Sequence, residues 1–268
     1  MTFDSILLVG CGNMAGAMLQ GWLASGLAPQ RFTVADPAPR DLPAGVRKLD
    51  AIPGEGAFDA ILLGVKPQLL GEVAPQVEPL AGPDAVLFSI LAGVELAVLD
   101  TAFARARGLV RVMPNLSAAL GKSPMAVASR RLDEPELRAV FELLAPLGMP
   151  ESVDEGDFDL VTALAGSGPA FVYRFIDALA AAAADLGLPQ DAARRLALAT
   201  VEGAAALAAA SPHDPGELAR RVASPGGTTQ AGLDALDEGD RLRALLEKTL
   251  RAARDRSAEM AAEARRKS

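Results

Sequence analysis

The sequence predicts an α/β fold in which a doubly wound parallel sheet occupies residues 1–153 and an all-helical domain occupies residues 154–268. Three observations favour this interpretation. Short, continuously apolar runs alternate with helix-like segments in the first part, as is typical of parallel strands covered on both faces. A glycine-rich turn follows the first of these runs directly. After residue 154 no strand pattern is found, and alanine-rich helical segments dominate.

The first domain is expected to contain five parallel strands. They cover residues 5–10, 31–36, 59–65, 85–91 and 109–113. A helix is expected over residues 14–25, and Gly26 follows it where a cap glycine belongs. The stretch 124–130, a helix over 133–147 and residues 151–153 are expected to complete the domain.

The second domain is expected to contain two long helices, over residues 158–186 and 191–210, that are apolar around most of their circumference. A helix of that kind must be buried. The helical half has little interior in which to bury both, so we expect them to pack against a second subunit, with a compact monomeric bundle as the alternative. An amphipathic, charged helix is expected over residues 236–266.

Composition excludes several classes of protein. Half of the 268 residues are hydrophobic, so a sizeable core can form, and the net charge of −8 lacks the basic surface that nucleic acid or anionic lipid needs. One cysteine leaves no disulfide framework and no cysteine-based zinc site, and one histidine leaves no site built on two histidines. The N-terminus is acidic and no charge-free stretch reaches 18 residues, so we expect a soluble, cytoplasmic protein.

A glycine motif lies between the first expected strand and the helix after it. Its sequence is Gly10-Cys11-Gly12-Asn13-Met14-Ala15, which fits G-x-G-x-x-A. Gly10 permits the tight turn, Gly12 lets the backbone approach a pyrophosphate, and Ala15 lets the helix pack closely on the strand. The free N–H groups of the helix start then face the phosphates. The motif predicts a Rossmann-type dinucleotide site, and a glycine-rich turn without ligand is the alternative.

The end of the second expected strand carries Asp36, 24 residues after Gly12. A carboxylate near this separation bonds the adenosine ribose and repels a 2′-phosphate, which favours NADH over NADPH. Arg40, four residues later, could instead meet a phosphate. A carboxylate that only caps the Pro37 turn is the alternative.

A second small-residue loop lies in the helical domain. Its sequence is Ala223-Ser224-Pro225-Gly226-Gly227-Thr228-Thr229. Either threonine can cap the helix that follows, and the loop exposes several N–H donors to a small anion such as a carboxylate. A plain turn between helices is the alternative.

Strong bases are scarce where a dehydrogenase would need one. No lysine occurs between Lys122 and Lys248, and the only histidine, His213, lies in a loop-like stretch. Oxidation of an alcohol normally needs such a base, whereas an imine nitrogen is itself basic and can arrive protonated. The pattern therefore favours reduction of a C=N bond.

Taken together, the motifs resemble those of the pyrroline-5-carboxylate reductases over nearly the whole chain. The matching segments are residues 10–15, 65–68, 111–115, 162–170 and 222–229. The resemblance implies reduction of L-1-pyrroline-5-carboxylate to L-proline by NADPH or NADH, the last step of proline biosynthesis. It also implies an N-terminal Rossmann domain and a helical dimerisation domain. Homodimers of the family intertwine, often join into a ring of five dimers, and complete each active site with the partner's glycine loop.

The resemblance also implies roles for single residues. Thr229 would be the catalytic residue that hydrogen-bonds the ring nitrogen, while Ser224, Gly227 and Thr228 would hold the carboxylate and Glu155 would line the proline pocket. Along the cofactor the resemblance places Val65, Lys66, Pro67, Ala92 and Asn115. With Asp36 and with Gly10, Gly12, Asn13, Met14 and Ala15 of the glycine motif, these are the residues predicted to bind the cofactor.

This chain departs from the family pattern at the cofactor end. Asp36-Pro37 stands where many bacterial members have Asn-Arg, which speaks against their usual NADPH preference. Two other classes of protein fit the sequence less well. A β-hydroxyacid dehydrogenase would need a lysine after residues 166–169, where none occurs before Lys248, and a dinucleotide sensor without turnover would not need the loop at 223–229. Arg221 replaces an asparagine of some members and stays unassigned.

Overall fold

The computed structural model of the chain describes residues 2–38 and 41–265. These form two compact units: unit 1 joins Met1–Ser167 with Ala252–Ser268, and unit 2 is Gly168–Arg251. The division differs from the expected boundary between residues 153 and 154. Residues 155–167 pack with the sheet because Phe158 is 1% exposed within one of its cores.

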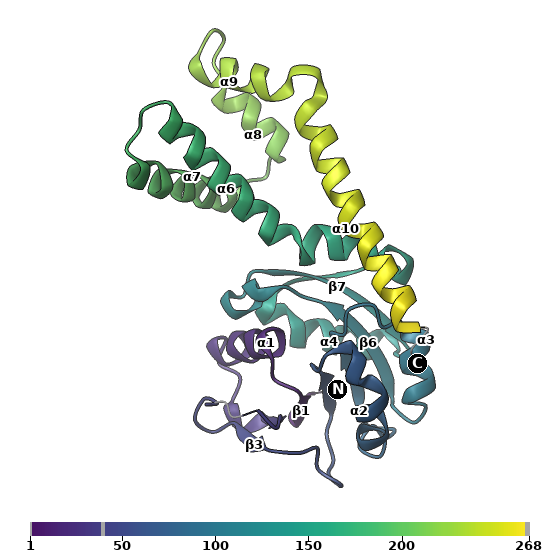
Figure 1. Cartoon of the computed structure of the whole chain (residues 1–268). Helices are drawn as coiled ribbons and strands as arrows, with labels where there is room; N and C mark the ends of the chain where they lie inside the picture. Colours follow the sequence, from purple (N-terminus) through teal and green to yellow (C-terminus); the bar gives the residue numbers. More distant parts are fainter. Residues whose placement is uncertain (1, 39–40, 266–268) are drawn as a thin grey trace. The chain divides into compact units, whose positions relative to one another are not determined.

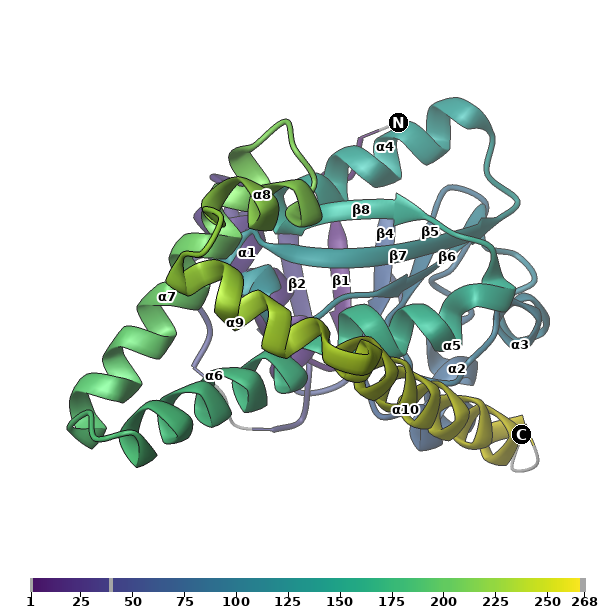
Figure 2. The same cartoon turned by 90° about the horizontal axis from the view of Figure 1, so that it is seen from above.

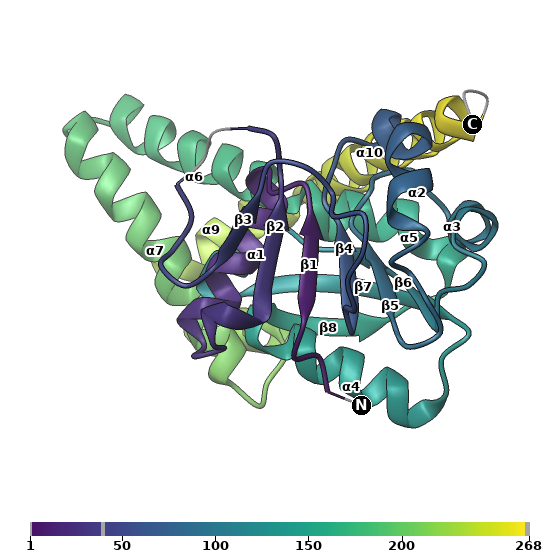
Figure 3. The same ribbon diagram turned by 90° about the horizontal axis from the view of Figure 1, so that it is seen from below.

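Unit 1 is built on a sheet that, within the described residues, has eight strands in the order β3-β2-β1-β4-β5-β6-β7-β8 (Figure 3). Their bounds are β1 Ile6–Val9, β2 Phe32–Ala35, β3 Arg47–Leu49, β4 Ala60–Leu63, β5 Val86–Ser89, β6 Gly108–Met113, β7 Ser123–Arg130 and β8 Gly148–Ser152. Neighbours from β3 to β6 are all parallel, which confirms the doubly wound Rossmann-type order. The short strand β3 was not expected, because it is charged and exposed rather than apolar.

One junction of the sheet is antiparallel. Strand β7 runs against β6, with Val112 opposite Val127, and β8 then lies parallel to β7. Residues 114–122 join β6 to β7, which is too short for the crossover that a parallel pair needs, whereas α4 (Glu134–Leu144) provides one between β7 and β8. Figure 2 shows β7 and β8 side by side. The sheet is thus mostly parallel rather than wholly so.

The sheet carries a hydrophobic core on each face. Ile6 and Leu8 of β1 face one core and Leu7 and Val9 face the other, so the strand is buried on both sides as its continuous apolar run predicted. Helices α1 (Asn13–Ala24) and α4 line the first core, and α2 (Leu70–Val77) and α3 (Leu96–Ala102) line the second.

The expected helix over residues 158–186 is interrupted. It begins as α5 (Phe158–Val161), widens into a π turn at Thr162–Gly166 and resumes as α6 (Gly168–Asp185). In the π turn the N–H of Ser167 donates to the Thr162 carbonyl, five residues back, at 2.9 Å. Such a turn commonly marks a functional position in a helix.

Unit 2 consists of helices, with α6 and α7 (Gln190–Ala210) packed together (Figure 1). Helices α8 (Pro215–Val222) and α9 (Thr228–Asp237) follow, and α10 (Arg241–Arg265) leads back into unit 1. The long helix expected from residue 236 starts only at Arg241, because Gly239 and Asp240 adopt positive φ and break it. Its expected end at Arg266 lies outside the described residues.

In the part of the chain that the structure describes, the large apolar side chains of α6 and α7 are mostly exposed. Tyr173 is 68% exposed, Phe175 51% and Leu207 64%, whereas the buried residues of these helices are alanines. This exposure argues against the monomeric-bundle alternative, in which such side chains would fill a core.

Candidate active site

The glycine motif forms the turn between β1 and α1. Gly10 has φ +82°, and a Cβ on it would lie 2.8 Å from Val65 Cγ1. A side chain at Gly64 would likewise meet Ala15 Cβ at 2.8 Å, so helix and strand pack as closely as the motif predicts. Gly10 is therefore required by the fold of the turn itself.

Gly12, unlike Gly10, meets no steric demand of the turn. It is the N-cap residue of α1, its side-chain position has no protein atom within 4 Å, and its φ of −65° suits any residue. No side chain caps this helix start, so the first N–H groups of Asn13, Met14 and Ala15 remain open to an anion. Space and donors both fit the pyrophosphate of a dinucleotide.

Asp36 lies at the end of β2 and contacts the glycine turn. Its Oδ2 accepts from the Cys11 N–H at 2.7 Å, and its Oδ1 accepts from the Ala38 N–H at 2.9 Å. The bond to Ala38 caps the Pro37 turn, as the alternative interpretation of Asp36 expects. The bond to Cys11 places the carboxylate beside the glycine motif. Binding of a ribose by Asp36 stays a prediction, and Arg40 lies outside the described residues.

The other predicted cofactor residues follow the carboxyl ends of neighbouring strands. Val65, Lys66 and Pro67 come after β4, and Ala92 comes after β5. The parallel register brings these ends to the edge that holds the glycine turn. Lys66 is exposed there and Val65 packs on Gly10.

Asn115 follows β6 and is buried, and its side-chain amide is hydrogen-bonded to other residues of the chain. Nδ2 donates to the Ala165 carbonyl at 2.9 Å, and Oδ1 accepts from the Ser117 N–H at 2.9 Å. Asn115 thus links the end of β6 to the π turn. Its contact with a cofactor stays a prediction.

The second loop joins α8 to α9 in unit 2. Gly226 has φ +70°, and a Cβ on Gly227 would lie 2.5 Å from Ser224 Oγ, so the turn needs both glycines for its own geometry. The N–H of Gly227 also donates to the Ser224 carbonyl at 2.9 Å. The glycines alone therefore do not distinguish a ligand site from a plain turn.

The start of α9 offers better evidence of a binding site. The expectation that Thr228 or Thr229 caps this helix is wrong: Gly227 is the N-cap, no side chain caps the helix, and both threonines lie inside its first turn. Their hydroxyls are exposed, and their N–H groups are among those that lack an intrahelical partner. Free N–H donors and free hydroxyls suit a small carboxylate.

Basic residues end the helix before this loop. Arg221 and Arg220 both bond the carboxylate of Glu217, and these hydrogen bonds, that of Arg221 first, hold the pKa of Glu217 below its ordinary value. Arg221 is therefore paired within α8. Nothing in these contacts assigns it to a ligand.

Glu155 belongs to unit 1 and has protein partners. Its Oε1 accepts from the Leu96 N–H at 2.6 Å and lies 3.3 Å from Nη1 of the buried Arg111. Its role toward substrate stays a prediction. Sequence reasoning assigned no role to Arg111, although a charged residue within the apolar run 109–113 was a signal.

Two absences concern only the described residues. Across 2–38 and 41–265 no three or more His, Cys, Asp or Glu side chains gather as metal ligands. Over the same ranges no helix is long and apolar enough to cross a membrane.

Comparison with known proteins decides the family. A family model described as pyrroline-5-carboxylate reductase dimerisation matches residues 155–260, and one described as NADP oxidoreductase, coenzyme F420-dependent, matches residues 5–93. The pyrroline-5-carboxylate reductase of Pseudomonas aeruginosa is 34% identical over 97% of this chain and 98% of its own length. The chain belongs to the pyrroline-5-carboxylate reductase family.

Other members agree over the same length. The pyrroline-5-carboxylate reductase of Methanosarcina acetivorans is 34% identical and covers 97% of this chain and 99% of its own. The solved structure of a pyrroline-5-carboxylate reductase from Coxiella burnetii is 28% identical, with a TM-score of 0.86 over 97% of this chain and 98% of that one. A Plasmodium falciparum pyrroline carboxylate reductase with NADP bound, 24% identical with a TM-score of 0.81 over 97% and 99%, shares the fold.

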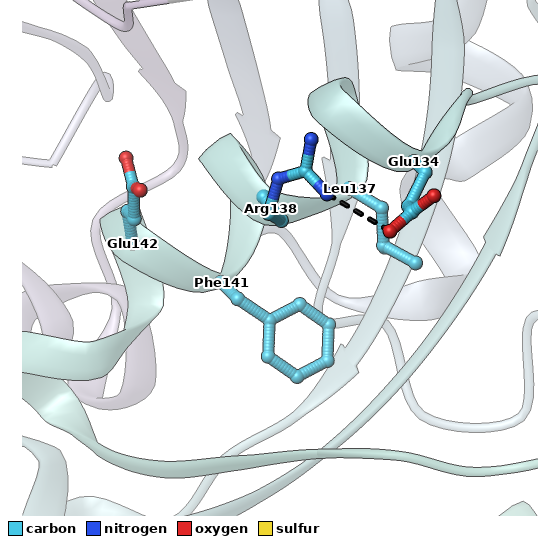
Figure 4. Close-up of a pocket in the computed structure, with 5 residues that line it drawn as sticks. All are labelled: Glu134, Leu137, Arg138, Phe141 and Glu142. Carbon is cyan, nitrogen blue, oxygen red and sulfur yellow. Dashed lines mark hydrogen bonds and ion pairs between the residues drawn. The ribbon is translucent and has the colours of Figure 1, made fainter.

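Helix α4 carries a surface hollow that is lined by none of the predicted site residues. Figure 4 shows it lined by Glu134, Leu137, Arg138, Phe141 and Glu142, with Arg138 bonded to Glu134. None of these residues belongs to the predicted reductase site, and all come from one helix.

Proposed function

We propose that this chain reduces L-1-pyrroline-5-carboxylate to L-proline with NADH or NADPH, the last step of proline biosynthesis. The observation that carries the proposal is full-length similarity to pyrroline-5-carboxylate reductases in a chain that has both glycine loops. The open side-chain position at Gly12 and the uncapped α1 support a dinucleotide in unit 1. A cytoplasmic location remains a prediction.

The cofactor is proposed to bind along the edge of the sheet that carries the glycine turn. Gly10 shapes the turn, and the N–H groups at the start of α1 face the pyrophosphate. The residues assigned to the cofactor are Gly10, Gly12, Asn13, Met14, Ala15, Asp36, Val65, Lys66, Pro67, Ala92 and Asn115. When bound, the nicotinamide supplies the hydride.

The substrate is proposed to bind at the start of α9. The backbone N–H of Thr228, with Ser224 and Gly227, holds its carboxylate, where the positive end of the helix favours an anion. The Thr229 hydroxyl hydrogen-bonds the ring nitrogen and fixes its orientation. Glu155 of unit 1 is also assigned to the substrate, and its Oε2 is the oxygen that the described contacts leave for this role.

The protein needs no strong base for this reaction. The imine nitrogen can carry its own proton, so the chain has to orient the ring, neutralise its carboxylate and exclude water. His213 lies before α8, in the stretch between α7 and α8, and the account gives it no role.

An assay of nucleotide oxidation tests the proposal against its rivals. With purified chain and pyrroline-5-carboxylate, absorbance at the reduced-nicotinamide band is expected to fall with equimolar proline formed. Oxidation of β-hydroxyacids with NAD⁺ or NADP⁺ instead would favour the dehydrogenase. Cofactor binding without turnover of either substrate would favour the sensor.

Asp36 is proposed to favour NADH over NADPH. Asp36→Ala is expected to lower the ratio of kcat/KM for NADH to that for NADPH by about tenfold, or ~1.4 kcal/mol, because a carboxylate no longer repels the 2′-phosphate. Asp36→Asn is the matched control for geometry, since it removes the charge but keeps an acceptor for the Cys11 N–H. An unchanged ratio in both variants would show that Asp36 does not read the ribose.

Self-association is proposed to run through the helical unit, as a homodimer and further as a pentamer of dimers. The exposed apolar side chains of α6 and α7 support the dimer. Light scattering is expected to give at least twice the chain mass of 27.6 kDa, and ten times that mass for the larger assembly. A species of single-chain mass at micromolar concentration would contradict the dimer.

A further inference from the structure

Arg111 is a buried charge in the middle of β6. Its side chain is 4% exposed, its Cζ lies 4.3 Å from the centre of the Phe158 ring, and its Nη1 lies 3.3 Å from Glu155 Oε1. The guanidinium is thus stacked on one residue and paired with another from the segment that follows β8. Burial of a charge is costly, so this arrangement needs a reason.

Stability alone is a poor reason. Among the described residues Arg111 Nε is buried without a hydrogen-bond partner. Burial lowers the pKa of Arg111, and nearby Glu155 and then Asp159 and Glu95 oppose that shift. Apolar replacements of buried ion pairs are often as stable as the pair, so a buried, incompletely bonded arginine is better explained by a role in positioning.

The residues around Arg111 belong to the two segments by which the chain passes between its units. Glu155, Phe158 and Asp159 lie in the segment 155–167, which ends where unit 2 begins. Asp159 Oδ1 accepts from Ser257 Oγ at 2.7 Å, and Ser257 lies in the returning segment of α10, in unit 1. We call residues 155–167 the first crossing segment and residues 252–262 the second. The cluster of Arg111, Glu155, Phe158, Asp159 and Ser257 therefore contacts both crossing segments.

The same cluster adjoins the predicted cofactor edge. Asn115, two residues beyond β6, donates to the Ala165 carbonyl in the first crossing segment. Gly93, next to Ala92, lies so close to the second that a Cβ on it would be 3.1 Å from Ala261 Cα. Glu155 also bonds the first N–H of α3 at Leu96. The loops after β5 and β6 are thus tied to both crossings.

We propose that Arg111 is a positioning residue, which fixes both crossing segments to β6 and thereby holds Glu155 and the loops after β5 and β6 in place for reaction. The inference rests on the proposed function. Arg111 itself touches neither substrate nor cofactor in this account, and acts through Phe158, Glu155 and the Asp159–Ser257 pair.

Kinetics of Arg111→Met test the proposal, because methionine fills similar apolar space without the charge. We expect kcat/KM for pyrroline-5-carboxylate to fall by about 10- to 100-fold, the effect of a misplaced reacting group, with the Kd for NADH within about twofold of wild type. Arg111→Lys keeps the charge for Glu155 and is expected to recover part of the loss. Arg130→Met, at an exposed pair with Asp100, is the matched control and should leave both constants unchanged.

Hydrogen–deuterium exchange measures how firmly the two crossing segments are held, and it does so independently of activity. In Arg111→Met, peptides from 155–167 and 252–262 are expected to exchange at least about tenfold faster, while α1 and α7 keep their wild-type rates. If Arg111→Met does not fold, Ser257→Ala is measured instead against Thr249→Ala on the same helix, and faster exchange in both segments with a raised KM is expected only for Ser257→Ala.

Wild-type exchange and kinetics in a folded Arg111→Met would overturn the inference, as would a Kd for NADH that rises in step with KM. Absence of turnover in the wild-type enzyme would instead refute the proposed function, and the exchange rates would still decide whether Arg111 anchors both segments.

Discussion

Thr229→Ala is expected to lower kcat for pyrroline-5-carboxylate by about 10- to 100-fold, which corresponds to ~1.4–3 kcal/mol of transition-state stabilisation. The hydroxyl lies exposed in the first turn of α9, where the account has it hydrogen-bonded to the ring nitrogen. Its loss removes that bond and leaves the backbone donors that hold the carboxylate. Steady-state rates with saturating nucleotide measure the effect.

Thr228→Ala is the matched control for this variant. Thr228 is the adjacent residue in the same helix turn and is also exposed, but it is assigned to the carboxylate through its backbone N–H. Its alanine variant should therefore stay within about threefold of wild type. Wild-type kinetics in Thr229→Ala, or equal losses in both variants, would remove the role assigned to Thr229.

Gly12→Val is expected to raise the Kd for NADH and NADPH by about 100-fold or more, or at least ~2.7 kcal/mol, while the folded protein keeps its stability. The valine side chain would enter space that no protein atom occupies but that the pyrophosphate needs. Fluorescence titration measures the Kd, and thermal unfolding measures the stability.

Gly10→Ala tests the other glycine of the motif, which is expected to matter for stability because its backbone conformation and close neighbours disfavour a side chain. Its φ of +82° and the closeness of Val65 predict a loss of about 1–3 kcal/mol in the free energy of unfolding. A Gly12→Val variant that binds nucleotide normally, or that unfolds as readily as Gly10→Ala, would contradict the cofactor role of Gly12.

Strands β1, β2, β4, β5 and β6 could be predicted because each is a short apolar run buried on both faces. The glycine turn could be predicted because the tight turn after a strand needs a positive φ at Gly10, which is a local requirement. Strand β3 was missed because a three-residue charged edge strand carries no apolar pattern, and the antiparallel β7 because direction depends on the length of a connection rather than on composition.

The candidate site was harder to predict where it depends on contacts distant in sequence. The π turn at Thr162–Gly166 had a visible signal in its small residues, but its bond to Asn115 joins residues 50 apart. The contacts of Glu155 with Leu96 and Arg111 likewise follow only from the packing of β6 against the segment after β8. Local pattern predicted which residues are special, and tertiary packing decided what they touch.

A crystal structure with proline and oxidised nicotinamide nucleotide bound tests the proposed reaction most directly. The account predicts that the proline carboxylate lies at the start of α9, its nitrogen at the Thr229 hydroxyl, and its ring carbon next to that nitrogen about 3–3.5 Å from the reactive carbon of the nicotinamide. Proline and nucleotide bound in separate cavities, beyond that reach in every active site of the assembly, would contradict it.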